Sequence, residues 1–263
     1  MAKKTTLSLK SMKENGEKIT MITAYDYSSA TLAQKAGIDT ILVGDSLQMV
    51  MLGDSSTIAA TTDVMIHHTK AVIAGAPDTF VVTDMPFGSC SSAATAIEHA
   101  TRIMKEGRCD AVKIEGGVSM ASIIRAVVDA GIPVVGHIGL TPQTTSKLGG
   151  FKVQGKTADA ARQLLEDAKA VEKAGAFALV MECVPAKLAA LVTKTLHIPT
   201  IGIGAGAGCD GQVLVYQDML GMFSDYRPKF VRKFAEVGKV MQEAFASYRS
   251  EIQEGNFPAE EHS

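Results

Sequence analysis

The chain has 263 residues, of which 46% are hydrophobic, 21% charged and 5% aromatic. These fractions are typical of a globular protein and exclude a disordered or fibrous chain. With 26 basic and 28 acidic residues the formal net charge is -2, so the overall charge predicts neither nucleic-acid binding nor attraction to an anionic membrane. No apolar run approaches the roughly 18 residues of a membrane span, and the first 18 residues lack the apolar segment of a secretory signal. The four cysteines show no paired spacing, and we therefore expect a cytoplasmic protein.

Recurring short apolar runs predict eight buried strands. The runs are rich in β-branched residues and apolar on both faces, which is typical of parallel strands covered by helices. In chain order they span residues 19–24, 40–44, 80–83, 111–114, 133–136, 177–181, 198–203 and 213–215.

Segments of helical composition lie between most of these runs, at residues 30–36, 63–74, 92–106, 119–129, 157–174 and 186–196. Three of them are followed by a glycine, Gly37, Gly131 or Gly175, at the point where the residue after a helix takes a positive φ. Strands that alternate with helices eight times predict a (β/α)8 TIM barrel. An open doubly wound sheet is the alternative, and it lacks support because no G-x-G-x-x-G follows the first run.

A glycine-rich segment, residues 201–208, follows the seventh predicted strand, which is the phosphate-binding region of many barrels. The segment lacks the Lys-Ser/Thr ending of a P-loop. A tight, close-packed turn and an anion site are both consistent with this pattern.

The C-terminal part, residues 228–255, again has a helical pattern. Its apolar stripe consists of Phe230, Phe234, Val237, Met241, Ala244 and Phe245. We expect this helix to pack on the barrel or on a neighbouring subunit rather than to bind a ligand. The sequence thus predicts a single barrel domain over residues 1–263, with a short N-terminal extension at about 1–18 and a C-terminal helix and tail at about 228–263.

Ionisable residues follow five of the predicted strands: Asp45, Asp84, Glu115, His137 and Glu182. A lone acid in such a position usually caps a helix or forms a loop salt bridge, but five side chains in register would converge on one mouth of a barrel. Four carboxylates there would repel one another unless a cation or protons intervened. Asp45, Asp84 and Glu115 are hard oxygen ligands without Cys or His at ligand spacing, which favours Mg²⁺ over zinc.

Further residues of these strands carry possible substrate chemistry. Lys113 lies two residues before Glu115 and therefore points the same way; it either binds a substrate carboxylate or only neutralises the acids. Glu182 follows an apolar run, and a carboxylate in such surroundings suits a general base near neutral pH. His137 either donates a hydrogen bond to substrate or is a structural histidine. Cys183 has no evident histidine partner, so core packing is favoured over a nucleophile.

Seven segments of the chain recur in one known family in the same order. They are Val43-Gly44-Asp45-Ser46-Leu47, Lys113-Ile114-Glu115-Gly116-Gly117, Gly136-His137-Ile138-Gly139-Leu140-Thr141-Pro142-Gln143, Gly149-Gly150-Phe151-Lys152-Val153-Gln154-Gly155, Glu182-Cys183-Val184-Pro185, Ile201-Gly202-Ile203-Gly204-Ala205-Gly206 and Glu260-Glu261-His262-Ser263. Through them the sequence resembles the ketopantoate hydroxymethyltransferase family from about Thr20 to the C-terminus. Each motif alone is modest, but together they are highly specific.

The resemblance implies a (β/α)8 enzyme of pantothenate synthesis that binds one Mg²⁺ per subunit. Its substrates would be 3-methyl-2-oxobutanoate and the one-carbon donor 5,10-methylenetetrahydrofolate, and its product 2-dehydropantoate, formed through an enolate that Mg²⁺ stabilises. Members form homodecamers, which gives the C-terminal helix an expected role in subunit contacts; neither nucleic acid nor a membrane is an expected partner.

The resemblance also implies roles for individual residues. The metal-associated acids would be Asp45, Asp84 and Glu115. The keto acid would contact Asp45, Ser46, Asp84 and Lys113, with His137 in the substrate pocket. Glu182 would accept the proton from C3 of the keto acid.

The sequence departs from the family pattern in three loops near the expected mouth. Gln48 stands where Gly is usual, Asp54 begins a changed segment after Gly53, and Cys90 stands where Tyr is common. Two other functions are weighed against hydroxymethyl transfer. One is a Mg²⁺-dependent lyase or aldolase acting on 2-keto acids, which needs a similar site. The other is a catalytically silent oligomeric barrel, which has no reason to keep four mutually repelling acids.

Overall fold

The computed structural model describes residues 2–150, 152–222 and 228–263, so Phe151 of the family-like segment lies outside the described residues. The chain divides into two compact units, residues 1–214 and 215–263, which are described separately. Among the described residues, no helix is both long enough and apolar enough to cross a membrane.

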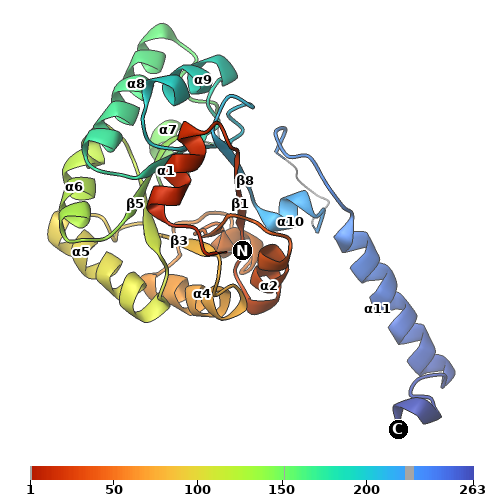
Figure 1. Cartoon of the computed structure of the whole chain (residues 1–263). Helices are drawn as coiled ribbons and strands as arrows, with labels where there is room; N and C mark the ends of the chain where they lie inside the picture. Colours follow the sequence, from red (N-terminus) through yellow and green to blue (C-terminus); the bar gives the residue numbers. More distant parts are fainter. Residues whose placement is uncertain (1, 151, 223–227) are drawn as a thin grey trace. The chain divides into compact units, whose positions relative to one another are not determined.

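Eight parallel strands of the first unit close into a barrel (Figure 1). β1 pairs with β2 on one side and with β8 on the other, which excludes the open sheet. The strands are β1 (Ile19–Thr23), β2 (Thr40–Val43), β3 (Phe80–Asp84), β4 (Ala111–Glu115), β5 (Val134–Gly139), β6 (Ala178–Glu182), β7 (Thr200–Ile203) and β8 (Gly211–Leu214). The predicted barrel and all eight predicted strands are confirmed, with boundaries shifted by a few residues at most.

Helices surround the barrel where the sequence predicts them. They are α2 (Tyr27–Lys35), α4 (Thr62–Gly75), α5 (Ala93–Arg102), α6 (Ala121–Asp129), α8 (Ala158–Lys173) and α9 (Ala186–Thr195). Side-chain oxygens cap the N-termini of α2, α4, α5 and α8, as at Ser92 and Thr157. The glycines that follow three of them, Gly37, Gly131 and Gly175, have φ values of 76°, 88° and 96°, which confirms the predicted helix ends.

Two of the connections between consecutive strands are not formed by a regular α-helix alone. The last four residues of the helix predicted over 92–106 belong instead to a π-helical turn, η1 (Ile103–Gly107). β7 and β8 are joined without a helix, through the glycine-rich segment. There a Cβ on Gly206 would lie 2.4 Å from the Cβ of Ala186, and one on Gly208 would lie 2.7 Å from the Cβ of Ala190. The glycines thus allow close packing on α9, which favours the tight turn over the anion site.

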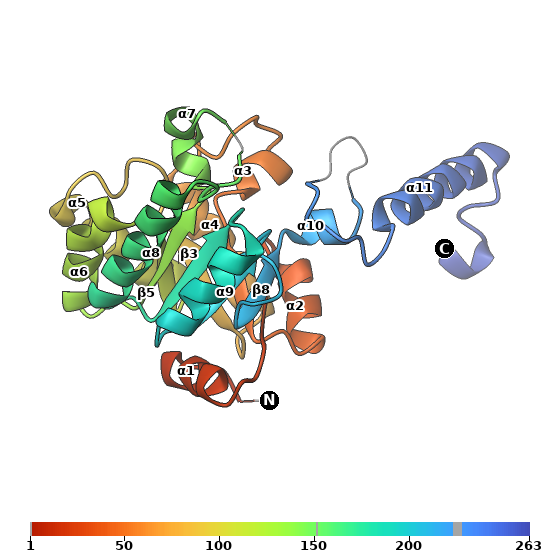
Figure 2. The same cartoon turned by 90° about the horizontal axis from the view of Figure 1, so that it is seen from above.

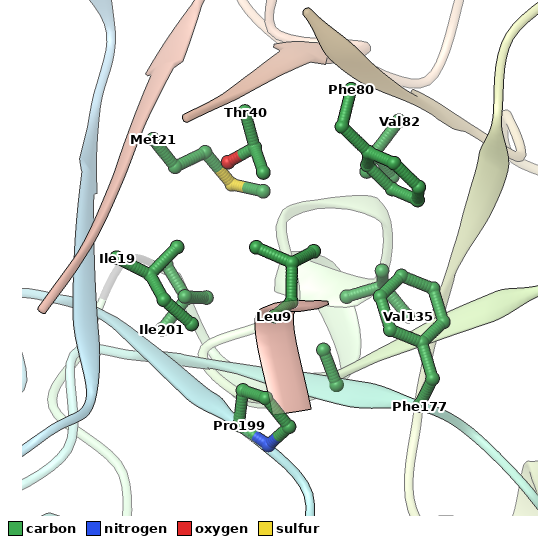
Figure 3. Close-up of a pocket in the computed structure, with 11 residues that line it drawn as sticks. Leu9, Ile19, Met21, Thr40, Phe80, Val82, Val135, Phe177, Pro199 and Ile201 are labelled. Atoms are coloured by element: carbon green, nitrogen blue, oxygen red, sulfur yellow. The ribbon is translucent and has the colours of Figure 1, made fainter. Parts of the chain in front are cut away.

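An additional helix, α1 (Thr6–Glu14), covers the end of the barrel at which the strands begin (Figures 1 and 2). The sequence predicts this segment only as an extension, and its part in the core is not predicted. Figure 3 shows Leu9 pointing into a ring of apolar side chains that includes Met21, Val135 and Ile201. Leu9 is 4% exposed, and the Lys13 ammonium lies 2.7 Å from Asp210 Oδ2, so packing and an ion pair both hold the helix.

The opposite end of the barrel, where the strands finish, carries short helical turns. Figure 2 shows α3 (Leu47–Val50) and α7 (Thr145–Leu148) at that end, away from α1. The 3₁₀ turns η2 (Val118–Met120) and η3 (Pro142–Thr144) follow β4 and β5. Connections at this end of a barrel are where ligand chemistry gathers.

The second unit contains α10 (Tyr216–Met219), α11 (Val237–Glu254) and η4 (Glu260–His262). The prediction of a helix from residue 228 is wrong for its first nine residues, so Phe230 and Phe234 are not part of the helical stripe. The reason is that N–H groups here donate to α10 and the turn after it, with Phe234 N bonded to Met219 O and Val237 N to Leu220 O. In the single chain the apolar side chains of α11 are exposed; they include Val240, Met241, Phe245, Tyr248 and Ile252.

Candidate active site

Consecutive strands bring the predicted site residues together at one mouth of the barrel. Asp45 lies just after β2, Asp84 ends β3, Lys113 and Glu115 lie on β4, His137 lies on β5, and Glu182 ends β6. The register pairs Asp84 with Lys113 and Glu115 with His137 across neighbouring strands. The side chains therefore converge as the sequence predicts.

The acids Asp45 and Asp84 are in direct contact at this mouth. The backbone N–H of Asp45 donates to Asp84 Oδ2 at 3.0 Å, and both side chains are buried. Burial, followed by repulsion from Asp84 and Glu115, raises the pKa of Asp45 well above its usual range. Burial also raises the pKa of Asp84, although the Lys113 ammonium opposes this. Both acids therefore take up a proton more readily than an exposed aspartate does.

Lys113 is a buried ammonium among these acids, as its position on the strand predicts. Its Nζ lies 3.1 Å from Asp84 Oδ1, 3.9 Å from Glu115 Oε1 and 3.1 Å from His137 Nδ1. Burial lowers its pKa, but attraction to Asp84, then to Glu115 and Asp45, outweighs burial and raises the pKa above its usual value. Lys113 therefore stays charged, with Asp84 and Glu115 on either side.

His137 links Glu115 to Glu182. Its Nδ1 lies 3.2 Å from Glu115 Oε1, and its Nε2 lies 3.3 Å from Glu182 Oε2. Burial and the Lys113 charge oppose protonation of His137, yet the two carboxylates raise its pKa to about 9. Burial would raise the pKa of Glu115, but the contact with His137 lowers it. The Glu182 side chain is 16% exposed against 3% for His137, so this chain of contacts runs from the buried acids to the accessible part of the mouth.

Buried polar atoms without a hydrogen-bond partner gather in this site. They include Asp84 Oδ1, Glu115 Oε1 and His137 Nε2, whose ionic neighbours are at contact distance but not in hydrogen-bonding geometry. Native interiors rarely leave such atoms unpaired. A ligand or an ion bound among these side chains would satisfy them.

The carboxylates of this site are candidate ligands for Mg²⁺. Within the described ranges, no three His, Cys, Asp or Glu side chains already form a group that could hold a metal ion. Asp45 and Asp84 nevertheless supply hard carboxylate oxygens, and a dication beside them would stabilise the charged carboxylates that burial, above all, disfavours. Glu115 supplies a third carboxylate. Its Oε2 accepts from the backbone N–H of Gln143, just as Asp45 Oδ2 accepts from the Gln143 side chain. The residues present therefore fit Mg²⁺ by the chemistry of their oxygen donors.

Two uncharged residues of the site, Gln143 and Tyr25, are not predicted from the sequence. The Gln143 side chain donates to Asp45 Oδ2 at 2.8 Å. The buried Tyr25 hydroxyl lies 2.8 Å from Ser46 Oγ. Tyr25 follows β1 just as the acids follow their strands, and this position could have identified it.

Backbone geometry places Glu182 beside β5. Gly139 has a φ of 92°, and a Cβ there would lie 2.3 Å from the Glu182 carbonyl oxygen, so only glycine allows this approach. The next residue, Cys183, also has a positive φ of 50°. Burial raises the pKa of its thiol to about 11, which leaves it protonated near neutral pH and supports the packing role over a nucleophile.

Two of the departures from the family pattern contact each other. The Gln48 side-chain amide donates to Asp54 Oδ2, and the Asp54 N–H donates to the Gln48 carbonyl at 3.0 Å. The changed loop is therefore tied to α3, which begins directly after Ser46. The third departure, Cys90, lies near the Ser89 hydroxyl, with its Sγ 3.8 Å from Ser89 Oγ.

A closed parallel barrel with ionisable side chains at the carboxyl ends of five consecutive strands defines a (β/α)8-barrel enzyme. The sequence model of the family "Ketopantoate hydroxymethyltransferase" matches residues 3–260. The chain belongs to this family, and the activity that goes with membership is ketopantoate hydroxymethyl transfer in pantothenate synthesis.

Similar sequences cover the whole chain. A 3-methyl-2-oxobutanoate hydroxymethyltransferase of Clostridium novyi (strain NT) is 59% identical over 261 residues, 99% of this chain and 95% of that protein. One from Enterococcus faecalis (strain ATCC 700802 / V583) is 57% identical over the same shares of the two chains. The predicted family and enzyme class are thereby confirmed.

Solved structures support the fold. Phosphonopyruvate hydrolase in complex with oxalate and Mg²⁺ has a TM-score of 0.66 at 14% identity, covering 98% of this chain and 92% of that chain. A 2,3-dimethylmalate lyase of the PEP mutase/isocitrate lyase superfamily has a TM-score of 0.64 at 16% identity, covering 98% and 88%. At these identities the likeness shows the barrel fold alone.

Proposed function

We propose that the enzyme transfers a hydroxymethyl group from 5,10-methylenetetrahydrofolate to 3-methyl-2-oxobutanoate and so forms 2-dehydropantoate, with Mg²⁺ as its metal. The observation that carries this proposal is the order of charges at the mouth. Buried Asp45 and Asp84 adjoin the Lys113 ammonium, and a more accessible carboxylate, Glu182, stands beyond His137. Such a site can bind an anionic keto acid and remove a proton from its carbon.

Substrate binding falls to the inner part of the site. Lys113 would pair with the carboxylate of the keto acid, and the Ser46 hydroxyl would donate a hydrogen bond to it. Asp45 and Asp84 would hold Mg²⁺, with Glu115 beside them. When bound, the ion supplies positive charge near the keto-acid oxygens, which stabilises negative charge that develops as the C3 proton is lost.

Proton removal falls to the outer part of the site. Glu182 would accept the C3 proton, after which C3 would attack the methylene carbon of the folate donor. Water would supply the hydroxyl oxygen as the bond from the methylene carbon to the folate nitrogen breaks, and tetrahydrofolate would leave with the proton. His137, held by Glu115 on its other side, would orient the Glu182 carboxylate through the contact of its Nε2 with Oε2. Glu182 is suited to this role because its side chain is more exposed than those of His137 and Glu115.

The decisive assay supplies the purified enzyme with 3-methyl-2-oxobutanoate and 5,10-methylenetetrahydrofolate, with and without EDTA. We expect 2-dehydropantoate to form, activity to be lost with EDTA, and Mg²⁺ to restore it. Product formation that is indifferent to EDTA would contradict the metal. Cleavage of a related 2-keto acid in place of transfer would indicate the lyase, and inactivity on both would indicate a silent barrel.

Glu182→Gln tests the base directly. The substitution keeps the size of the side chain but removes its basicity, so exchange of the C3 proton for deuterium should fall by about a hundredfold or more. Binding of the keto acid, followed by calorimetry, should stay within about threefold, because Lys113 and the acids at its side are unchanged. Wild-type exchange in the folded variant would exclude Glu182 as the base.

We also propose that the enzyme assembles as a homo-oligomer, a homodecamer by family resemblance, and that α11 lies at a subunit interface. Support comes from the exposed apolar side chains of α11, such as Phe245, which is 65% exposed in the single chain. Apolar surface of this extent is usually covered by a partner.

A further inference from the structure

The turn after β5 places Gln143 between the two parts of the active site. The turn, η3, is held by its own hydrogen bonds: the N–H of Thr144 donates to the Thr141 carbonyl at 2.9 Å, and the hydroxyls of the two residues lie 2.6 Å apart. Just before the turn, the N–H of Leu140 donates to the Glu182 carbonyl at 2.8 Å. The backbone of Gln143 is therefore anchored to the ends of both β5 and β6.

Gln143 contacts one carboxylate through its side chain and another through its backbone. Its Nε2 donates to Asp45 Oδ2 at 2.8 Å and to the Met85 carbonyl at 2.9 Å. Its backbone N–H donates to Glu115 Oε2 at 3.1 Å. Both partners of the side-chain amide are acceptors, so the NH₂ group must face them; the reversed amide would set its oxygen against a carboxylate and a carbonyl.

In both Asp45 and Glu115, Gln143 holds one carboxylate oxygen and leaves the other for contacts within the site. Asp45 and Glu115 each lose one oxygen to Gln143. For Glu115 the other oxygen, Oε1, then faces His137 at 3.2 Å. Asp45 adjoins Asp84, while Glu115 begins the chain of contacts to Glu182. Gln143 thus ties the part of the site that would bind substrate to the part that would move a proton.

We propose that Gln143 is a positioning residue: its side chain fixes the Asp45 carboxylate for the cation and the keto acid, and its backbone fixes Glu115 independently. This inference rests on the proposed function. It predicts that the two contacts are separable, since a change of side chain leaves the backbone N–H in place.

Two variants test the inference, with Mn²⁺ as the probe ion. Gln143→Ala removes the bond to Asp45 but keeps the backbone bond to Glu115. Gln143→Glu keeps the size of the side chain and puts an oxygen in place of the donor that faces Asp45. Binding of Mn²⁺ in the presence of 3-methyl-2-oxobutanoate is titrated by electron paramagnetic resonance, and KM and kcat are measured separately with Mg²⁺.

We expect the Ala variant to bind Mn²⁺ about tenfold more weakly and to show a similar rise in KM for the keto acid, with kcat within about threefold of wild type, because a hydrogen bond to a charged group is lost. The Glu variant should bind Mn²⁺ more weakly still. Gln154→Ala is the matched control: the same side chain in the same connection, its amide donating to the Lys152 carbonyl at 2.9 Å, should behave as wild type.

Wild-type Mn²⁺ affinity and KM in the folded variants would overturn the inference, as would a fall in kcat with unchanged Mn²⁺ binding. Thermal melting checks folding, and the near-isosteric Glu variant decides if the Ala variant does not fold. Failure of the proposed function is seen in a different experiment: the wild-type enzyme would form no 2-dehydropantoate. The Mn²⁺ titration is independent of that result because it is measured without turnover.

Discussion

Tyr25 and Ser46 show how a neutral residue can orient a substrate contact. The Tyr25 ring is fully buried, and its hydroxyl meets Ser46 Oγ at 2.8 Å. Burial raises the pKa of Tyr25, so the phenol keeps its proton and remains a hydrogen-bonding partner of the serine hydroxyl. Because Ser46 is proposed to contact the carboxylate of the keto acid, the orientation of its hydroxyl bears on affinity.

Tyr25→Phe removes this contact and keeps the ring. We expect KM for 3-methyl-2-oxobutanoate to rise about three- to tenfold while kcat changes by less than about twofold, since one hydrogen bond to a binding group is lost. Steady-state kinetics at saturating folate donor measure both constants. Tyr27→Phe is the control, because Tyr27 is 58% exposed on α2. An unchanged KM in Tyr25→Phe would show that the tyrosine does not orient Ser46.

At this scale the charged residues of the site could be predicted from their positions after the strands, and so could Tyr25, but the role of Gln143 could not. Asp84 and Glu182 were found because strand ends of a barrel share one mouth, and charge at those positions is visible in a sequence. Gln143 lies four residues past the end of β5, and its contact with Asp45 depends on the path of the η3 turn. No pattern in a single sequence fixes such a path, so the contact between Gln143 and Asp45 could not be predicted.

Among the structural elements, α3 and the loop after it carry the departures from the family. Gln48 is 8% exposed, and its side-chain amide is paired with Asp54, while its Oε1 has no hydrogen-bond partner. The two changed positions thus compensate each other: an amide that would be costly to bury alone is paired with a carboxylate. The bond holds the loop against the helix that follows Ser46.

Asp54→Ala breaks this pair. The loop should open more often. The backbone N–H at position 54, which donates to the Gln48 carbonyl, should therefore exchange its hydrogen about five- to tenfold faster than in the wild type. Hydrogen exchange followed by mass spectrometry on peptides covering residues 51–57 measures the effect. Ser55→Ala, an exposed change in the same loop, should leave the exchange rate as in wild type. Equal rates in both variants would show that the Gln48–Asp54 pair does not hold the loop.

The helix α1 is the element that sequence patterns failed to predict. In this nine-residue helix only Leu9 and Met12 are buried, so its apolar stripe is too narrow to stand out. Its partners, which include Ile19 and Ile201, come from the beginnings of barrel strands and are assembled only when the barrel closes (Figure 3). The strands themselves were predictable because their apolar runs are continuous.

Leu9→Ala tests how much α1 contributes to stability. Removing a buried leucine from this ring should lower the free energy of unfolding by about 2–5 kcal/mol. Urea denaturation followed by circular dichroism measures the change. Leu7→Ala on the same helix is the control, because Leu7 is 76% exposed and should change stability by less than about 0.5 kcal/mol. Equal stabilities of the two variants would show that Leu9 adds little to the core.

At the scale of the whole molecule, α11 is the helix proposed to mediate assembly into a homo-oligomer. Its apolar residues recur at helical spacing, with Met241, Phe245, Tyr248 and Ile252 on one side of the helix. An amphipathic helix whose apolar side is exposed in a single chain gains stability when a second copy covers it.

Phe245→Glu places a charge in the middle of this stripe. We expect the assembly to dissociate into smaller species, because burying an unpaired carboxylate in an apolar interface is strongly unfavourable. Light scattering coupled to size-exclusion chromatography measures the mass. Ala246→Glu adds the same charge one residue away, outside the stripe, and should preserve the mass of the wild type. A variant Phe245→Glu with the wild-type mass would place the interface elsewhere.

The docking of α1 has a consequence for the order in which the chain acquires its structure during synthesis. Lys13 bonds to the Thr193 carbonyl and to Asp210, partners 180 and 197 residues further along the chain. A ribosome releases α1 before these partners, which emerge only after most of the barrel has been translated. The helix is therefore made before the barrel but reaches its native contacts only once the barrel is nearly complete, and until then the apolar side chains at this end of the nascent barrel have no cover.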